Sequence, residues 1–261
     1  MSEYLLEVKD IKKSFEKRNH TLNVLGNINM KVEESEFICV MGPSGCGKST
    51  LVKIIEGIEK ADKGEVYLNG EKLPEKISKS IQKKFGIVYQ NANLLDWMST
   101  WENVRLPLSI FHEGRGEAVY GKISEALKLV GLLDFKDCYP HELSGGMRQR
   151  AAIARALVTD PDILILDQPF GALDAITRHM LNIELLKIWH ESKRTCIMIT
   201  NNVNEALYLG SKILFLSKSP ATVIKEIKVP FSYEEKNNGF ETSDEYLRLR
   251  SELNQLVRNI K

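Results

Sequence analysis

Long apolar runs are missing from this sequence, and their absence limits what the chain can do alone. No stretch approaches the roughly 18–20 consecutive apolar residues that a membrane-spanning helix needs. The first ten residues, MSEYLLEVKD, are charged and contain no apolar core followed by a cleavage site. We therefore expect the chain to stay in the cytoplasm, and any role at a membrane then requires a partner that spans it.

Cysteine and net charge are also scarce. The four cysteines are scattered and form no CxxC pair, so we expect reduced thiols and neither a disulfide framework nor a metal site. Lys and Arg number 36 against 35 Asp and Glu, which leaves a net charge of +1. Because this balance supplies no bulk positive charge for a phosphate backbone, we predict no nucleic-acid partner.

What remains is a 261-residue chain of ordinary globular composition, 43% hydrophobic and 27% charged, which can bury a substantial core. Short apolar runs at Phe37–Met41, Ile163–Leu166, Thr195–Thr200 and Lys212–Leu216 predict buried strands. Helical periodicity lies between them, most clearly over residues 91 to about 158, where we predict an inserted helical subdomain. Strands that alternate with helices indicate an α/β fold with a largely parallel sheet.

The two ends of the chain give weaker patterns. The first 35 or so residues predict short strands with turns at Lys17–His20 and Glu33–Ser35. Asn69–Gly70, after the apolar Val66–Leu68, is a hairpin signal. Asp244–Lys261 predicts an amphipathic helix that packs on the body of the protein.

The segment GPSGCGKST directly follows the strand predicted at Phe37–Met41 and matches the pattern GxxxxGK[ST]. Glycines let backbone N–H groups converge on phosphate oxygens, and a helix that begins near Lys48 points its positive end at the same anion. Lys48 should reach the β- and γ-phosphates, and Ser49 should ligate Mg²⁺. A chance glycine-rich turn is disfavoured by the strand before it and the helix after it. The predicted phosphate loop comprises Gly42, Pro43, Ser44, Gly45, Cys46, Gly47, Lys48, Ser49 and Thr50.

A second pattern is the apolar run Ile163–Leu166 that ends in Asp167. The last side chain of a buried parallel strand lies at the carboxyl edge of the sheet, where we expect the phosphate loop as well. Asp167 could then hold the Mg²⁺ shell from the side opposite Ser49. Many strands end in Asp, so this pattern gains its force only in combination with the phosphate loop.

A third pattern is Leu143-Ser144-Gly145-Gly146-Met147. Ser144 can cap a helix, while Gly145 and Gly146 expose N–H groups that could bind an anion; an ordinary capped helix is the alternative. With this segment the sequence resembles the ABC transporter ATPase family, whose signature is LSGGQ or LSGGM. The resemblance implies that two subunits sandwich two ATP molecules, each between the phosphate loop of one subunit and the signature of the other.

The resemblance covers nearly the whole chain and implies its fold. It predicts a P-loop NTPase cassette with a RecA-like core, an antiparallel β subdomain and the inserted helical subdomain. The ABC domain would span residues 1–230, and residues 231–261 would form a C-terminal helical extension. Gln90 resembles the glutamine of the Q-loop, which contacts Mg²⁺ and water, and Phe15 lies where the family stacks an aromatic ring on adenine. Gly171–Asp174 resembles the D-loop.

Two segments, Leu94–Val104 and Gln168–Asp174, are similar to those of importers for nitrate, sulfonate and taurine. This similarity implies a peripheral subunit at the cytoplasmic face of the membrane that works with a permease subunit, a second cassette and, indirectly, an extracytoplasmic solute-binding protein. The apolar residues after Gln90 would receive a coupling helix of the permease. Alternatively, Leu94, Leu95 and Trp97 form the core of the subdomain, and the two interpretations are compatible.

The sequence departs from the family at its catalytic positions. Gln168 stands where the family has the Glu that acts as general base, Asn201 replaces the switch His, and Asn202 replaces the following Asp. An amide cannot accept a proton, and general-base catalysis is typically worth about 10²–10⁴ in rate. A smaller departure is Ser35, where the family usually has Gly, which we interpret as turn variation. We expect an ATP hydrolase of reduced turnover.

Three explanations of these departures stay open: natural degeneracy of one site in a heterodimer, an engineered trap, or a site that still turns over, since small GTPases position water with a Gln. Three functions compete as well. An importer ATPase and a regulatory, largely non-hydrolysing subunit both fit the motifs. A soluble ABC protein of translation or DNA repair fits less well, because the chain has one cassette and no coiled-coil insertion.

Overall fold

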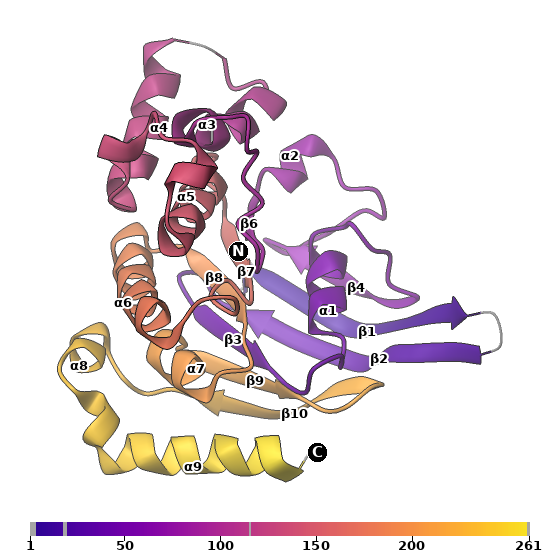
Figure 1. Ribbon diagram of the computed structural model, residues 1–261. Helices are drawn as coiled ribbons and strands as arrows, with labels where there is room; N and C mark the ends of the chain where they lie inside the picture. The colour runs from indigo at the N-terminus through magenta and orange to yellow at the C-terminus, as the bar shows by residue number, and fades with distance from the viewer. Residues whose placement is uncertain (1–3, 18–19, 115, 260–261) are drawn as a thin grey trace. The chain divides into compact units, whose positions relative to one another are not determined.

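The structure is a computed structural model that describes residues 4–17, 20–114 and 116–259 (Figure 1). The chain divides into two compact units. The first combines the residues up to Ile77 with those from Thr195 onward, and the second is the continuous segment Ser78–Arg194. Among the described residues, no helix has both the length and the apolar character needed to cross a membrane.

The first unit is built on a mixed sheet whose strands follow the order β5-β4-β1-β2-β10-β9-β3-β8. β1, β2, β4 and β5 are joined by antiparallel pairs, whereas β3 pairs in parallel with both β8 and β9. Every residue of β3 and β8 is buried, as expected for parallel strands covered on both faces. The strands of this unit are β1 (Leu6–Lys17), β2 (His20–Val32), β3 (Phe37–Met41), β4 (Lys63–Leu68), β5 (Glu71–Lys72), β8 (Thr195–Ile199), β9 (Lys212–Leu216) and β10 (Ala221–Lys228).

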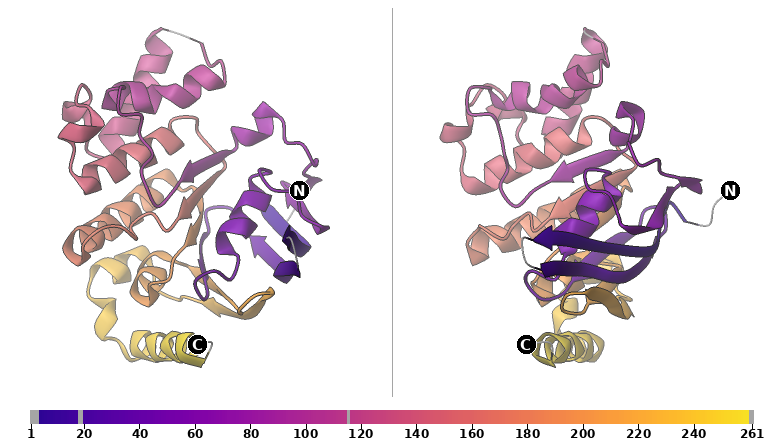
Figure 2. Two further views of the ribbon diagram at one scale, coloured as in Figure 1. Left: turned by 45° about the vertical axis from the view of Figure 1, so that its right-hand side comes forward. Right: turned by 90° about the vertical axis from the view of Figure 1, so that its right-hand side faces the viewer.

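The prediction of short strands before residue 35 was wrong. β1 and β2 have 12 and 13 residues and run side by side as one long ribbon, which Figure 2 shows from two sides. Their register shifts between Val8 and Ile11, where Asp10 adopts a left-handed backbone with φ of 51°. Such a bulge interrupts the alternation of apolar and polar residues, so one strand looks like two in the sequence.

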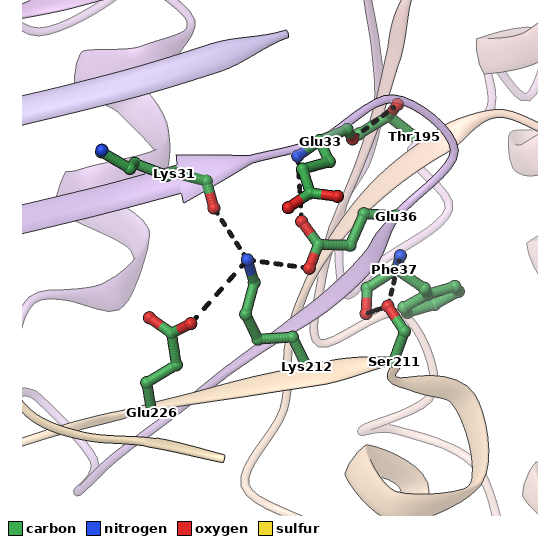
Figure 3. A network of polar contacts seen from close by, with 8 residues as sticks. All are labelled: Lys31, Glu33, Glu36, Phe37, Thr195, Ser211, Lys212 and Glu226. Atoms are coloured by element: carbon green, nitrogen blue, oxygen red, sulfur yellow. Dashed lines mark hydrogen bonds and ion pairs between the residues drawn. The ribbon is translucent and has the colours of Figure 1, made fainter. Parts of the chain in front are cut away.

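The turn between β2 and β3 is fixed by a polar network (Figure 3). The Glu36 carboxylate accepts a hydrogen bond from the Glu33 amide at 2.9 Å, and the Lys212 amine lies 2.8 Å from Glu36 Oε1. The same amine donates to the Lys31 carbonyl at 3.0 Å. These contacts link the turn to β9.

Five helical segments complete the described part of the first unit. α1 (Lys48–Ile55) follows β3, and α7 (Val203–Leu209) follows β8. The C-terminal part contains α8 (Tyr233–Asn237), a short 3₁₀ turn at Phe240–Thr242, and α9 (Asp244–Asn259). α9 packs on α7 through its buried apolar face, and the hydroxyl of Tyr246 lies 3.2 Å from Asn204 Oδ1.

The second unit pairs β6 (Phe85–Val88) with β7 (Ile163–Asp167) in parallel, and α3, α4 and α6 contact α5. α5 packs against α3 and α4, so it is the central helix of this unit. Ser99 and Glu102 form a capping box that begins α3, and Asp174 caps α6. The helices are α2 (Lys79–Gln82), α3 (Thr100–Ile110), α4 (Glu117–Leu129), α5 (Gly145–Leu157) and α6 (Ala175–Ser192), with 3₁₀ turns at Leu133–Phe135 and Pro140–Glu142.

Candidate nucleotide-binding site

The phosphate loop joins β3 to α1 in the first unit, and its glycines are required by its geometry. Gly45 and Gly47 have φ of 76° and 111°, which L residues rarely adopt. A Cβ built on Gly47 would lie 2.6 Å from Val24 Cγ1, so a side chain there would collide with β2. A Cβ on Gly45 would meet no described atom within 4 Å, so this peptide faces open space. The loop is therefore packed on one side and accessible on the other.

Lys48 lies beneath this loop. Its side chain is buried, with 5% of the residue surface exposed, and its amine donates to the carbonyls of Gly42 and Pro43, both at 2.8 Å. Ser49 and Thr50, half-buried, occupy the first turn of α1, where the backbone N–H groups carry a partial positive charge. An amine, two hydroxyls and a helix N-terminus at one loop form a donor set that fits polyphosphate, with an oxygen ligand for its Mg²⁺.

The segment Thr200–Asn202, which contains the predicted switch residue Asn201, lies at the same edge of the sheet as the phosphate loop. β3 and β8 are parallel neighbours with Val40 opposite Ile199, and the Thr200 amide donates to the Val40 carbonyl at 3.3 Å. The carboxyl ends of the two strands therefore lead into the phosphate loop and into Asn201, respectively. Asn201 is exposed.

Asn202 has a different role in the fold. Its side-chain oxygen accepts hydrogen bonds from the amides of Asn204 and Glu205 at 2.9 and 3.3 Å and so caps α7. Its own amide donates to Thr200 Oγ1 at 3.0 Å. Asp would cap the helix equally well, so this helix start is compatible with either residue.

Phe15 is half-buried on β1, and the Lys13 amine lies 4.9 Å from the centre of its ring. Two carboxylates, Glu59 and Asp62, also flank this amine. A ring that contacts a cation on one face can stack with its other face. The adenine-stacking role of Phe15 stays a prediction.

In the second unit, the acidic strand and the Q-loop end side by side. β6 and β7 are parallel with Val88 opposite Leu166, so Gln90 and Asp167 both follow the carboxyl edge of this pair. Asp167 and Gln168 are half-buried, and Gln168 has a left-handed backbone with φ of 50°. The Gly171 amide donates to the Gln168 carbonyl at 3.0 Å. A Cβ on Gly171 would lie 3.3 Å from Gln90 Nε2, so the amide of Gln90 rests against this turn.

The signature segment begins α5. Ser144 Oγ accepts a hydrogen bond from the Met147 amide at 3.2 Å, and Arg148 donates to the Leu143 carbonyl at 2.6 Å, which holds the turn from behind. Cβ atoms on Gly145 and Gly146 would lie 3.2 Å from Leu173 Cδ2 and 3.1 Å from Thr177 Cγ2. The signature glycines therefore allow close packing against the D-loop and α6.

The D-loop ends at Asp174, which caps α6. Hydrogen bonds from the Thr177 amide and hydroxyl, and from the Ile176 amide, hold the pKa of Asp174 below its usual value. Within this unit, a cavity of about 370 Å³ lies between the Q-loop, the start of α5 and the D-loop. Gln90, Gly145, Arg148 and Leu173 contribute to its lining. Three motifs that are far apart in the sequence thus surround one cavity.

Sequence reasoning missed the residues that hold these motifs in place. Gln149 and Arg155 of α5 and Asn103 of α3 each bind backbone groups of the segment that follows β6. Gln149 and Asn103 are buried, with 4% and 0% of their surfaces exposed. A polar residue on the apolar face of a predicted helix is the signal that could have identified them.

Comparison with known proteins agrees with these observations. Residues 25–171 match the family model of the ABC transporters. The chain is 40% identical to an aliphatic sulfonates import ATP-binding protein of Bacillus thuringiensis, over 96% of this chain and 94% of the relative. It is also 40% identical to a nitrate import ATP-binding protein of Synechococcus elongatus, over 87% and 81% of the two chains. A bicarbonate transport ATP-binding protein of Synechocystis is 39% identical over 94% and 86%.

Solved structures show the same fold. A dimeric post-hydrolysis state of an ATP-binding cassette bound to ADP and Pi superimposes with a TM-score of 0.75 at 34% identity, over 87% of this chain and all of that chain. A subunit of a cbiONQ transporter complex from Clostridium perfringens reaches a TM-score of 0.79 at 24% identity, over 97% of this chain and all of that chain, and supports the fold alone. The phosphate loop, the acidic strand and the signature thus occur together in an ABC cassette fold, and this chain belongs to the ABC transporter family.

Proposed function

We propose that this chain is the ATP-binding subunit of an ABC importer for a small solute. The observation that carries the proposal is the phosphate loop, in which a buried lysine amine, exposed loop backbone and a helix N-terminus form one anion site. The signature, folded as a capped helix start in the same chain, supports pairing with a second cassette. The pair would close head-to-tail on two molecules of MgATP.

The proposal assigns a role to each site residue. Lys48 and the loop amides from Gly42 to Gly47 bind the phosphates of ATP, and Phe15 stacks on adenine. Ser144, Gly145 and Gly146 bind the nucleotide held by the other subunit. Gln168 and Asn201 take the positions of the general base and of the switch residue. The Mg²⁺ ligands are Ser49, Gln90 and Asp167.

The partners follow from the same relatives. Sulfonate, nitrate and bicarbonate are small oxyanions, so we propose a cargo of this kind, taurine included. Such a subunit lies at the cytoplasmic face of the membrane, bound to a permease, with a solute-binding protein on the other side. Trp97 is 72% exposed, whereas Leu94 and Leu95 are half-buried. This division supports Trp97 as the permease contact and the two leucines as subdomain core.

A second candidate function is a regulatory subunit that binds ATP and hydrolyses little of it. Two amides, Gln168 and Asn201, stand at the positions of the general base and of the switch residue, and the amide of Gln168 cannot accept a proton. The signature of such a chain would still complete the site of a partner that carries Glu and His. The still-active explanation differs from the natural and the engineered ones in turnover, and all three leave nucleotide binding intact.

Equilibrium binding of MgATP tests the shared part of both functions. Lys48→Ala should weaken binding about 10- to 100-fold, because it removes a charged hydrogen bond to phosphate. Lys53→Ala is the matched control, since Lys53 lies in the last turn of the same helix and is exposed. Equal affinities of the two variants, measured by equilibrium dialysis, would exclude the phosphate loop as the nucleotide site.

A further inference from the structure

The backbone on either side of Gln90 is held by side chains of α5. Gln149 Nε2 donates to the Tyr89 carbonyl at 3.1 Å. Arg155 donates to two successive carbonyls, through Nη2 to Ala92 at 2.6 Å and through Nη1 to Asn93 at 2.7 Å. The guanidinium thus holds two adjacent peptides with both of its terminal nitrogens, an arrangement that a lysine amine reproduces poorly.

These bonds connect the Q-loop to the signature through one rigid element. α5 begins at Gly145, and Arg155 lies ten residues further along, which corresponds to about 15 Å of helix. Arg155 is partly buried, and the loss of water around its side chain lowers its pKa while the guanidinium stays charged. A displacement of the signature end of α5 must therefore move the carbonyls of the Q-loop or break these charged hydrogen bonds.

The next part of the loop is equally well held. Asn103 on α3 has no exposed surface, and its amide donates to the carbonyls of Leu95, Met98 and Ser99 at 3.0–3.1 Å. Its side-chain oxygen accepts the Leu95 amide at 2.8 Å. α3 packs against α5. The exposed Trp97 therefore lies on a segment whose backbone is fixed by hydrogen bonds. This segment is connected to the signature through α3 and α5.

We propose that Arg155 is a positioning residue that couples the signature to the Q-loop and to the Trp97 surface. When Ser144 and Gly146 engage the nucleotide of the second cassette, α5 shifts, and Arg155 carries this shift to residues 89–97. The inference rests on the proposed function, because it needs an ATP-dependent contact at the signature. A structural path alone shows no coupling, so the test must measure a response at one end to a ligand at the other.

Trp97 supplies that measurement. The chain contains three tryptophans, so Trp101→Phe with Trp189→Phe leaves Trp97 as the single reporter. In this background MgATP should change the Trp97 emission. Arg155→Met should reduce the change at least fivefold while the affinity for MgATP stays within twofold. Arg155→Lys keeps the positive charge but cannot donate to two carbonyls from two terminal nitrogens. This variant should retain less than half of the change in Trp97 emission.

Arg150→Met is the matched control. Arg150 lies on the same helix and donates to the Val130 carbonyl at 3.2 Å, outside the Q-loop, and it pairs with Glu184. This variant should keep the full change in emission. If Arg155→Met does not fold, as judged by its circular dichroism, Arg155→Lys decides the question.

Two results would overturn the proposal: a full response in the Arg155 variants, or a parent protein that binds MgATP without any change in Trp97 emission. A parent protein that binds no MgATP at all would instead overturn the proposed function, and this inference would fall with it. Dialysis and fluorescence on the same samples therefore separate the two failures.

Discussion

At the residue scale, the three residues that the sequence analysis compared with the family motifs, Gln168, Asn201 and Asn202, have different physical roles. Asn202 caps α7 through its side-chain oxygen, which an aspartate would do in the same way. Asn201 is exposed at the end of β8, and Gln168 occupies a left-handed turn after β7. We infer that the side chain at 202 serves the fold, and we propose that those at 168 and 201 serve the chemistry.

This distinction predicts the effect of substitutions at Asn202. Asn202→Ala should lower the free energy of unfolding by about 1 kcal/mol, because two amides of the first turn lose their acceptor. Asn202→Asp should lie within about 0.5 kcal/mol of the wild type, because the carboxylate caps as well and favours the helix dipole. Urea denaturation measures both. Equal stability of all three proteins would show that the cap contributes nothing.

Ser35 has a backbone conformation that its residue type does not indicate. Its backbone is left-handed, with φ of 61°, and its amide donates to Thr195 Oγ1 at 2.9 Å. The turn thus has a conformation that favours glycine although serine occupies it. The bond that fixes it comes from a residue 160 positions away, so no local pattern could have predicted it.

At the element scale, the C-terminal extension is tied to α7 by a buried lysine. Lys236 of α8 is 3% exposed, and its amine donates to the carbonyls of Leu209 and Gly210 at 3.3 and 2.7 Å. It therefore binds the C-terminal end of the helix that Asn202 caps at the other end. Burial lowers the pKa of Lys236 from 10.5 to about 8, while nearby Cys39 acts in the opposite direction.

The depressed pKa predicts the direction of a pH effect. Between about pH 8 and pH 10.5 the unfolded chain binds more protons at this amine than the folded protein, so the contribution of Lys236 to stability rises with pH. Wild type should gain on the order of 1–2 kcal/mol relative to Lys236→Met between pH 7.5 and 9.5. Denaturation at both pH values gives this difference, in which the titration of other groups largely cancels. A flat or falling difference would contradict the assignment.

Many of the strands could be predicted from the sequence. Phe37–Met41 and Lys212–Leu216 were predicted as strands with the bounds found for β3 and β9. β3 is wholly buried between parallel strands and is therefore a short apolar run, and β9 is buried at every position after Lys212. The hairpin at Asn69–Gly70 is also present, between β4 and β5. β10 was missed, since its sequence, ATVIKEIK, is polar at half of its positions. It forms a hairpin with β9 and also pairs in parallel with the distant β2.

The candidate site was predictable only as motifs. Local spacing identifies the phosphate loop and the signature, because backbone geometry restricts which residues can form them. The bonds from Gln149 and Arg155 to the Q-loop span 60 to 63 residues, and neither donor belongs to a turn pattern. These hydrogen bonds depend on how α5 packs against the Q-loop, and no local sequence pattern predicts this packing.

At the scale of the whole molecule, turnover distinguishes a degenerate motor from a working one. Gln168→Glu with Asn201→His should raise ATP hydrolysis by a hundredfold or so, since general-base catalysis contributes about 10²–10⁴ in rate. The release of phosphate over time measures hydrolysis, at MgATP concentrations that give both proteins the same fraction of bound nucleotide. Lys48→Ala in the double variant is the negative control. A wild type that hydrolyses ATP as fast as the double variant would make Gln168 a working residue and the chain an ordinary homodimeric motor.

The topology of the first unit also has a consequence for synthesis on the ribosome. β3 is wholly buried and hydrogen-bonds to β8 and β9, and the earlier of these partners, β8, is completed 158 residues after β3 (from Met41 to Ile199). At about 5–20 residues per second the delay is roughly 10–30 s. The continuous segment Ser78–Arg194 can form its own contacts during that time, whereas β3 has no partner strand in its parallel sheet. The nascent chain therefore exposes an apolar strand during synthesis, and we expect chaperones to shield this strand from aggregation.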